Sequence, residues 1–75
     1  MGTCHLAIAY YFNENYDKAI SLFLSFDLNK QPILAYWLGL SYVAKEDVEN
    51  AKLYLKKAIT AGVDVPVEVL DYVNS

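Results

Sequence analysis

Residues 37–58, WLGLSYVAKEDVENAKLYLKKA, decide the fold of this 75-residue chain. A leucine and a glycine, Leu38-Gly39, precede an aromatic residue, and the small residues Ala51 and Ala58 enclose Leu55. A shift of 32 positions superimposes most of these landmarks on an earlier copy: Leu6, Ala7, Tyr10, Ala19 and Phe23 fall on Leu38, Gly39, Tyr42, Ala51 and Leu55. Internal repetition at such a period is the signature of repeat architectures. We therefore interpret the chain as two copies of one unit.

The apolar residues of both copies recur at helical spacing. The pattern predicts five helices: Thr3–Phe12, Tyr16–Phe26, Pro32–Lys45, Val48 to just before Gly62, and Val67–Val73. Asn15 and Asp47 precede two of these helices, where each side chain can accept a backbone N–H as an N-cap. Gly62 can take the left-handed conformation that commonly ends a helix. Residues 63–69 alternate like an edge strand, but the central Pro66 and the lack of a partner strand favour a helix.

The second copy resembles the tetratricopeptide repeat (TPR), a helix–turn–helix unit of about 34 residues with the pattern W-x2-L-G-x2-Y followed by Ala, Phe or Tyr, and Ala. The match is carried by Leu38-Gly39, Tyr42, Ala51, Leu55 and Ala58. Two positions depart from the pattern: Ala35 replaces the usual tryptophan, and Phe26 replaces the second small residue of the first copy.

The resemblance implies an all-α fold of two TPR-like helix–turn–helix hairpins plus a C-terminal capping helix, a fragment of a right-handed α-superhelix. We expect a single TPR-like domain over residues 1–75. Repeat one then covers about 3–31, repeat two about 32–62, and the capping helix about 65–73.

Composition and charge disfavour several classes of function. The six positive charges are all Lys and the formal net charge is −3, so the chain should repel phosphate, and we expect no nucleic-acid binding. No apolar stretch approaches the roughly 18–20 residues of a membrane span. The apolar opening is not led by Lys or Arg, as a signal peptide would be. We expect no membrane span and a cytoplasmic location.

The sequence offers little chemistry. Cys4 and His5 are the only cysteine and histidine, and adjacent helical residues do not face each other, so they cannot act as a nucleophile–base pair. The carboxylates Glu46, Asp47 and Glu49 gather at a turn, where capping and solvation explain them. No phosphate-binding loop or metal-ligand spacing occurs. We expect no enzyme, no cofactor and no metal.

The chain is rich in aromatic residues, with seven Tyr, three Phe and one Trp, more than a two-repeat core can hold. In the TPR family the first helix of each unit lines a concave groove. The resemblance implies a nearly uncharged groove, with Cys4 and Ala44 among the positions that face it. We predict these partner-binding residues: Ile8, Tyr11, Phe12, Ile33, Tyr36, Trp37, Leu40 and Val43.

The groove implies a protein–protein interaction module that binds an apolar helix or peptide segment of a partner, with a chaperone-like role as one form. Tyr11, Tyr36 and Trp37 would be its anchors, since Tyr and Trp dominate binding hot spots. A structural or assembly role stays open beside it. In that case the chain is a piece of a longer repeat array or a self-associating homo-oligomer, because repeat arrays usually need polar caps to be stable. The apolar groove would then be covered by further repeats, by a second copy of the chain or by the fifth helix.

Overall fold

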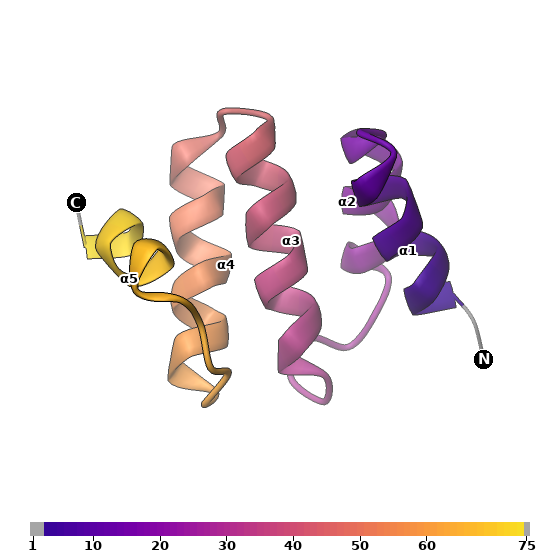
Figure 1. Cartoon of the computed structure of the whole chain (residues 1–75). Coiled ribbons are helices and arrows are strands. Elements are labelled where there is room, and N and C mark those ends of the chain that lie inside the picture. The colour runs from indigo at the N-terminus through magenta and orange to yellow at the C-terminus, as the bar shows by residue number, and fades with distance from the viewer. Residues whose placement is uncertain (1–2, 75) are drawn as a thin grey trace.

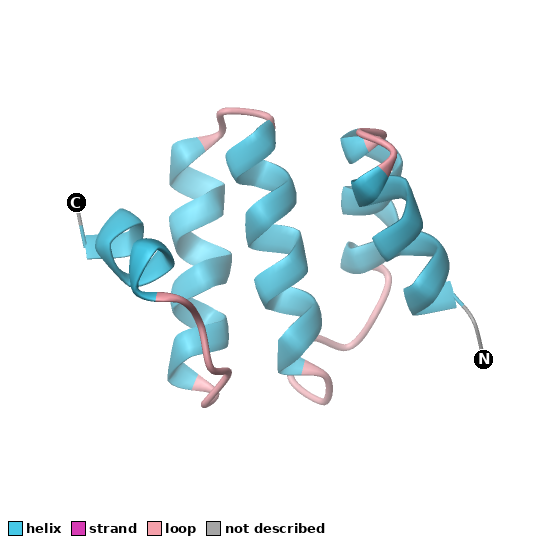
Figure 2. Cartoon of the chain, viewed as in Figure 1, coloured by secondary structure: helices cyan, strands magenta, loops and turns pink. Residues whose placement is uncertain are grey.

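The computed structural model describes residues 3–74, with side chains from residue 5 onward. This part of the chain contains five helices and no strand: α1 (Thr3–Phe12), α2 (Tyr16–Leu24), α3 (Pro32–Ala44), α4 (Val48–Thr60) and α5 (Val67–Asn74) (Figure 1). Figure 2 shows short loops between them. The predicted all-α fold is confirmed. Within residues 3–74, no helix has the length and apolar character needed to cross a bilayer.

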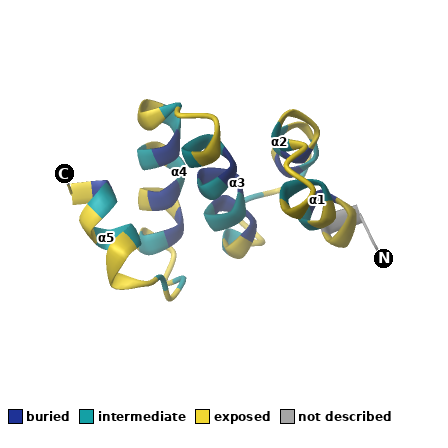
Figure 3. Cartoon of the chain, turned by 45° about the horizontal axis from the view of Figure 1, so that its top comes forward, coloured by how far each residue is buried: buried dark blue, intermediate teal, exposed yellow. Residues whose placement is uncertain are grey.

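The helices form two antiparallel hairpins, α1–α2 and α3–α4, followed by α5. Helix α3 packs against α4, α2 and α1, whereas α5 contacts α4. In Figure 1 the first helix of each hairpin and α5 lie toward the viewer, and Figure 3 again places α1 and α5 on one side with α2 on the other. We call the side formed by α1, α3 and α5 the front face.

The two hairpin turns share one backbone conformation. Glu14 and Glu46, 32 positions apart, have left-handed φ values of 63° and 62°. The N–H of Asn15 donates to the carbonyl of Tyr10 at 2.8 Å, and the N–H of Asp47 donates to the carbonyl of Tyr42 at 2.9 Å. These are the long-range bonds of the Schellman motif. The 32-residue repeat is therefore present in the backbone as well as in the sequence.

A third Schellman turn ends α4. Gly62 has a φ of 95°, and the N–H of Val63 donates to the carbonyl of Ala58 at 3.0 Å. Glycine pays no steric penalty in this conformation, whereas an L-residue such as Glu does. The predicted helix stop at Gly62 is confirmed.

The two predicted N-caps behave differently. Asp47 Oδ1 accepts the backbone N–H of Asn50 at 3.4 Å, and Oδ2 accepts its side-chain amide at 2.8 Å. The prediction for Asn15 is wrong, because its side chain makes no capping hydrogen bond. The residue three positions after Asn15 is Lys18, whose ammonium instead lies 5.6 Å from the centre of the Tyr10 ring. Lys18 is the equivalent of Asn50 in the first copy, and it has no side-chain amide to donate to the cap residue as Asn50 does to Asp47.

The interior is built from the small and large residues of the repeat. Among the described residues, ten apolar side chains are buried and at most 6% exposed: Ala7, Ala19, Phe23, Leu34, Ala35, Leu38, Ala51, Leu55, Ala58 and Val73. Ser41 is the buried polar residue among those described, and its hydroxyl donates to the carbonyl of Trp37 at 3.0 Å. No described buried side-chain N or O atom lacks a hydrogen-bond partner.

Gly39 allows α3 and α4 to approach closely. A Cβ added at Gly39 would lie 2.6 Å from Cγ and 2.7 Å from Cδ2 of Leu55, which is itself 1% exposed. The backbone nitrogen of Leu55 is 3.2 Å away. Because core side chains are close-packed, Leu55 has little room to withdraw.

We expect Gly39→Ala to destabilise the fold. In an open helix this change gains up to about 1 kcal/mol, but here overpacking costs about 1–3 kcal/mol, so the net loss should be up to about 2 kcal/mol. Urea unfolding followed by helical circular dichroism measures the change. The same substitution in a Leu55→Ala background should cost less, because Leu55 no longer fills the space. Equal stabilisation in both backgrounds would contradict the close contact.

We expect Glu46→Gly to stabilise the fold by about 0.5–1 kcal/mol, since glycine relieves the left-handed strain. Glu49→Gly, which removes the same carboxylate type from the right-handed helix α4, is the matched control and should destabilise by about 1 kcal/mol. Thermal unfolding of both variants separates the backbone effect from loss of charge. A loss of stability in Glu46→Gly would refute the assignment of strain.

Candidate partner-binding surface

An aromatic cluster joins α1 to α3 at the front face. The Trp37 ring centre lies 5.5 Å from that of Tyr11, 5.7 Å from that of Phe12 and 6.0 Å from that of Tyr36, all edge-to-face. Tyr16 of α2 joins the cluster through Tyr11, with ring centres 5.6 Å apart. Edge-to-face pairs contribute about 0.5–1.5 kcal/mol beyond their buried area. We call these five residues the aromatic cluster.

Four of the predicted site residues belong to the aromatic cluster, but they are not equally accessible. Tyr11 and Trp37 are half-buried and pack against the core, as does the predicted Ile8. Phe12 is 67% exposed, and the predicted Ile33 on α3 is 47% exposed. The inner rings therefore brace α1 against α3, while Phe12 and Ile33 present apolar surface to solvent.

The last two predicted residues, Leu40 and Val43, lie in a separate place. They line a hollow of about 200 Å³ whose other walls come from Leu55 of α4 and from Glu68, Val69 and Tyr72 of α5. We call this the α3–α5 hollow. Trp37 precedes Leu40 by about one turn of α3, so the two residues are neighbours on the helix, one in the aromatic cluster and the other in the hollow.

No α5 residue is among the predicted site residues, although a fifth helix that covers the groove is one of the alternatives that the sequence leaves open. The spacing of Val69 and Tyr72 puts both on one side of a helix. This spacing indicates that α5 has an apolar side. It does not indicate which helices that side contacts. Two further residues were predicted to face the groove: Cys4 lies outside the described side chains, and Ala44 is exposed.

Two tyrosines have raised pKa values. Burial raises the pKa of Tyr11 above 10.0, and the neighbouring Tyr16 and Tyr36 phenols add to the effect. Burial is also the main cause that raises the pKa of Tyr42. Tyr54 and Asp47 raise this pKa further, and the rings of Tyr42 and Tyr54 are stacked with their centres 5.6 Å apart. A raised tyrosine pKa keeps the phenol neutral to higher pH, so Tyr11 brings no charge to the aromatic cluster at neutral pH.

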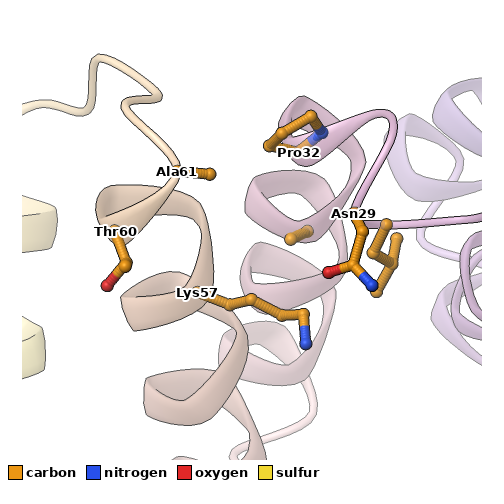
Figure 4. Close-up of a pocket in the computed structure, with 7 residues that line it drawn as sticks. Asn29, Pro32, Lys57, Thr60 and Ala61 are labelled. Atoms are coloured by element: carbon orange, nitrogen blue, oxygen red, sulfur yellow. The ribbon is translucent and has the colours of Figure 1, made fainter.

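A further hollow, of about 300 Å³, lies between the start of α3 and the end of α4 (Figure 4). Asn29 and Lys57 reach toward it from opposite walls, with Pro32 and Ala61 at its upper side and Thr60 on the wall formed by α4. None of the predicted site residues lines it. Its polar groups are exposed side chains, and no described set of three or more His, Cys, Asp or Glu residues in the structure could hold a metal ion. The geometry assigns this hollow no defined chemistry.

The all-helical fold with an apolar front face defines a helical-repeat protein. Residues 34–61, which include most of α3 and all of α4, match the family model of the tetratricopeptide repeat. The predicted TPR-like repeat is confirmed over this hairpin, and the TPR is typical of protein–protein interaction modules. Neither the curated proteins nor the solved structures contain a match to the chain.

Proposed function

We propose that this chain is a non-enzymatic protein–protein interaction module whose front face binds an apolar helix or peptide segment of a partner. The observation that carries the proposal is the exposure of Phe12 at the edge of the aromatic cluster. Around it, α1 and α3 contain no Lys, Asp or Glu, so a partner would meet an uncharged surface over both helices.

The physical basis of binding is burial of apolar area. Covering a large apolar side chain such as Phe12 or Ile33 contributes about 1.5–3 kcal/mol. The rings of Tyr11 and Trp37 are already held by their neighbours, so binding would cost little of their conformational freedom. A chaperone-like protein of the cytoplasm that shields an apolar segment of its client would use the same face, and we include that role in the proposal.

We expect Phe12→Ala to weaken binding of an apolar helix by about tenfold or more, because the lost burial is worth at least about 1.4 kcal/mol. The probe is a synthetic amphipathic helix of Leu and Gln, titrated while the emission of the single tryptophan, Trp37, is recorded. Leu53→Ala is the matched control, since Leu53 is 57% exposed on α4. It should leave affinity unchanged.

Urea unfolding tests whether Phe12→Ala acts through the fold. Phe12 is mostly exposed, but the substitution removes its edge-to-face contacts with Tyr11 and Trp37, so the free energy of unfolding should fall by about 1–3 kcal/mol while the chain still folds. Equal weakening by both substitutions, or no binding of the Leu/Gln helix to the unmodified chain, would refute the proposed function.

An assembly role is the second candidate, and the first hairpin favours it. Leu6 and Leu24 are 48% and 47% exposed, and Leu6 lines a hollow of about 240 Å³ with Tyr10 and Leu22. Repeat units bury such faces against neighbouring units. Another copy of the chain or a further repeat would cover this surface.

Under the assembly role, sedimentation equilibrium should show a species larger than 8.5 kDa that Leu6→Lys dissociates, because a buried lysine is costly. Leu53→Lys on α4 is the control and should leave the association unchanged. A monomer at all concentrations would remove this candidate and leave the front face free for a different protein.

A further inference from the structure

The α3–α5 hollow has the size and lining of a pocket for one apolar side chain. Its volume is about 200 Å³, and four of its six lining residues are apolar, with the buried Leu55 among them. An apolar cavity of roughly 150 Å³ is enough to hold benzene. The hollow can therefore accept a leucine, methionine or phenylalanine side chain from a bound segment.

The charges of the chain are divided between the front face and the rest of the molecule. Helices α1 and α3 contain no Lys, Asp or Glu, and α5 contains Glu68 and Asp71 but no Lys. The six lysines lie on α2, on α4 or in the connecting segments: Lys18, Lys30, Lys45, Lys52, Lys56 and Lys57. The acidic residues of the front helices, Glu68 and Asp71, therefore have no lysine on the same helices.

One of these carboxylates belongs to the hollow. Glu68 lines it and is exposed, so it stands at the rim while Leu40 and Val43 form the apolar wall. Asp71 follows Glu68 by one helical turn on α5, which places the two acidic groups near each other. A segment that inserts an apolar side chain would thus pass an acidic rim.

We propose that the partner segment is basic and amphipathic: it inserts an apolar side chain into the α3–α5 hollow and pairs a Lys or Arg with Glu68. This inference rests on the proposed function and specifies its ligand. An acidic segment is disfavoured, because like charges at an interface are repulsive and suppress wrong partners. The net charge of −3 acts in the same direction at longer range.

The test compares four synthetic helical peptides of equal length built from Leu and Lys, Leu and Gln, Leu and Glu, and Ala and Lys. Trp37 emission and calorimetry report their binding. We expect the Leu/Lys peptide to bind about threefold to fivefold more tightly than Leu/Gln, the range of exposed ion pairs. Leu/Glu should bind more weakly than Leu/Gln, and Ala/Lys should not bind, because it brings no side chain large enough to fill the hollow.

Variants of the chain locate the charge effect. Glu68→Gln should abolish the preference for Leu/Lys over Leu/Gln and leave the Leu/Gln affinity unchanged. Asp64→Asn is the matched control, since Asp64 is exposed and precedes α5 without lining the hollow. It should keep most of the preference, although it removes the same charge from the chain.

The outcomes separate this inference from the proposed function. Equal affinity for Leu/Lys and Leu/Gln would overturn the inference and leave the proposed function standing, whereas no binding of any Leu peptide would overturn both. Equal effects of Glu68→Gln and Asp64→Asn would indicate diffuse attraction and overturn the role of Glu68. Self-association that Glu68→Lys abolishes would make a second copy the occupant and would also overturn the inference.

Discussion

The close approach of α3 and α4 at Gly39 and Leu55 is the contact on which the rest of the structure depends. With no side chain at Gly39, Leu55 fills the space against the α3 backbone, and the two helices form one tightly packed hairpin. Leu55 is also part of the α3–α5 hollow. The contact between Gly39 and Leu55 thus belongs to the core of the repeat and also positions Leu55 in the wall of the α3–α5 hollow.

Helix α3 is fixed by that contact and organises both of its neighbours. Its Trp37 ring meets Tyr11 and Phe12 of α1, while Leu40 and Val43 face the side where α5 lies. No charged residue interrupts α3, so the helix can be apolar on the side toward α4 and on the front face at once. The same composition that makes α3 a core helix also makes its remaining surface a candidate for binding.

The fold was largely predictable because its signals are local. Helical periodicity, the small residues of the repeat and the left-handed Gly62 are all readable within one or two turns of sequence. The predicted Asn15 cap is wrong for a reason that the N-cap preferences of single residues do not include. Asp47 accepts a second hydrogen bond from the side chain of Asn50. The residue equivalent to Asn50 in the first hairpin is Lys18, which lies against the Tyr10 ring instead. A capping helix was predicted at the position of α5, but the hollow that Val69 and Tyr72 line with residues of α3 was not predictable, since it depends on contacts between residues far apart in the chain.

The candidate site was predictable as a set of residues but not as a surface. The resemblance assigned Tyr11, Trp37 and Phe12 to one groove, and the structure brings their rings together. The resemblance could not say which of these rings pack between the helices and which stay exposed, because that depends on how closely α1 approaches α3. The result is a division of labour in which Tyr11 and Trp37 hold the hairpins together and Phe12 remains exposed.

This division couples the stability of the domain to its occupancy. A chain of this size buries only about 60% of its unfolded surface and is marginally stable, and its front face leaves Phe12 and Ile33 in water. A partner that covers the face would stabilise the folded state by about 2.7 kcal/mol at a concentration of 100 times the Kd. The aromatic cluster would transmit that gain to both hairpins, because its rings join α1 to α3. Under the proposed function, the exposed apolar face would be one half of a larger core that a second molecule completes.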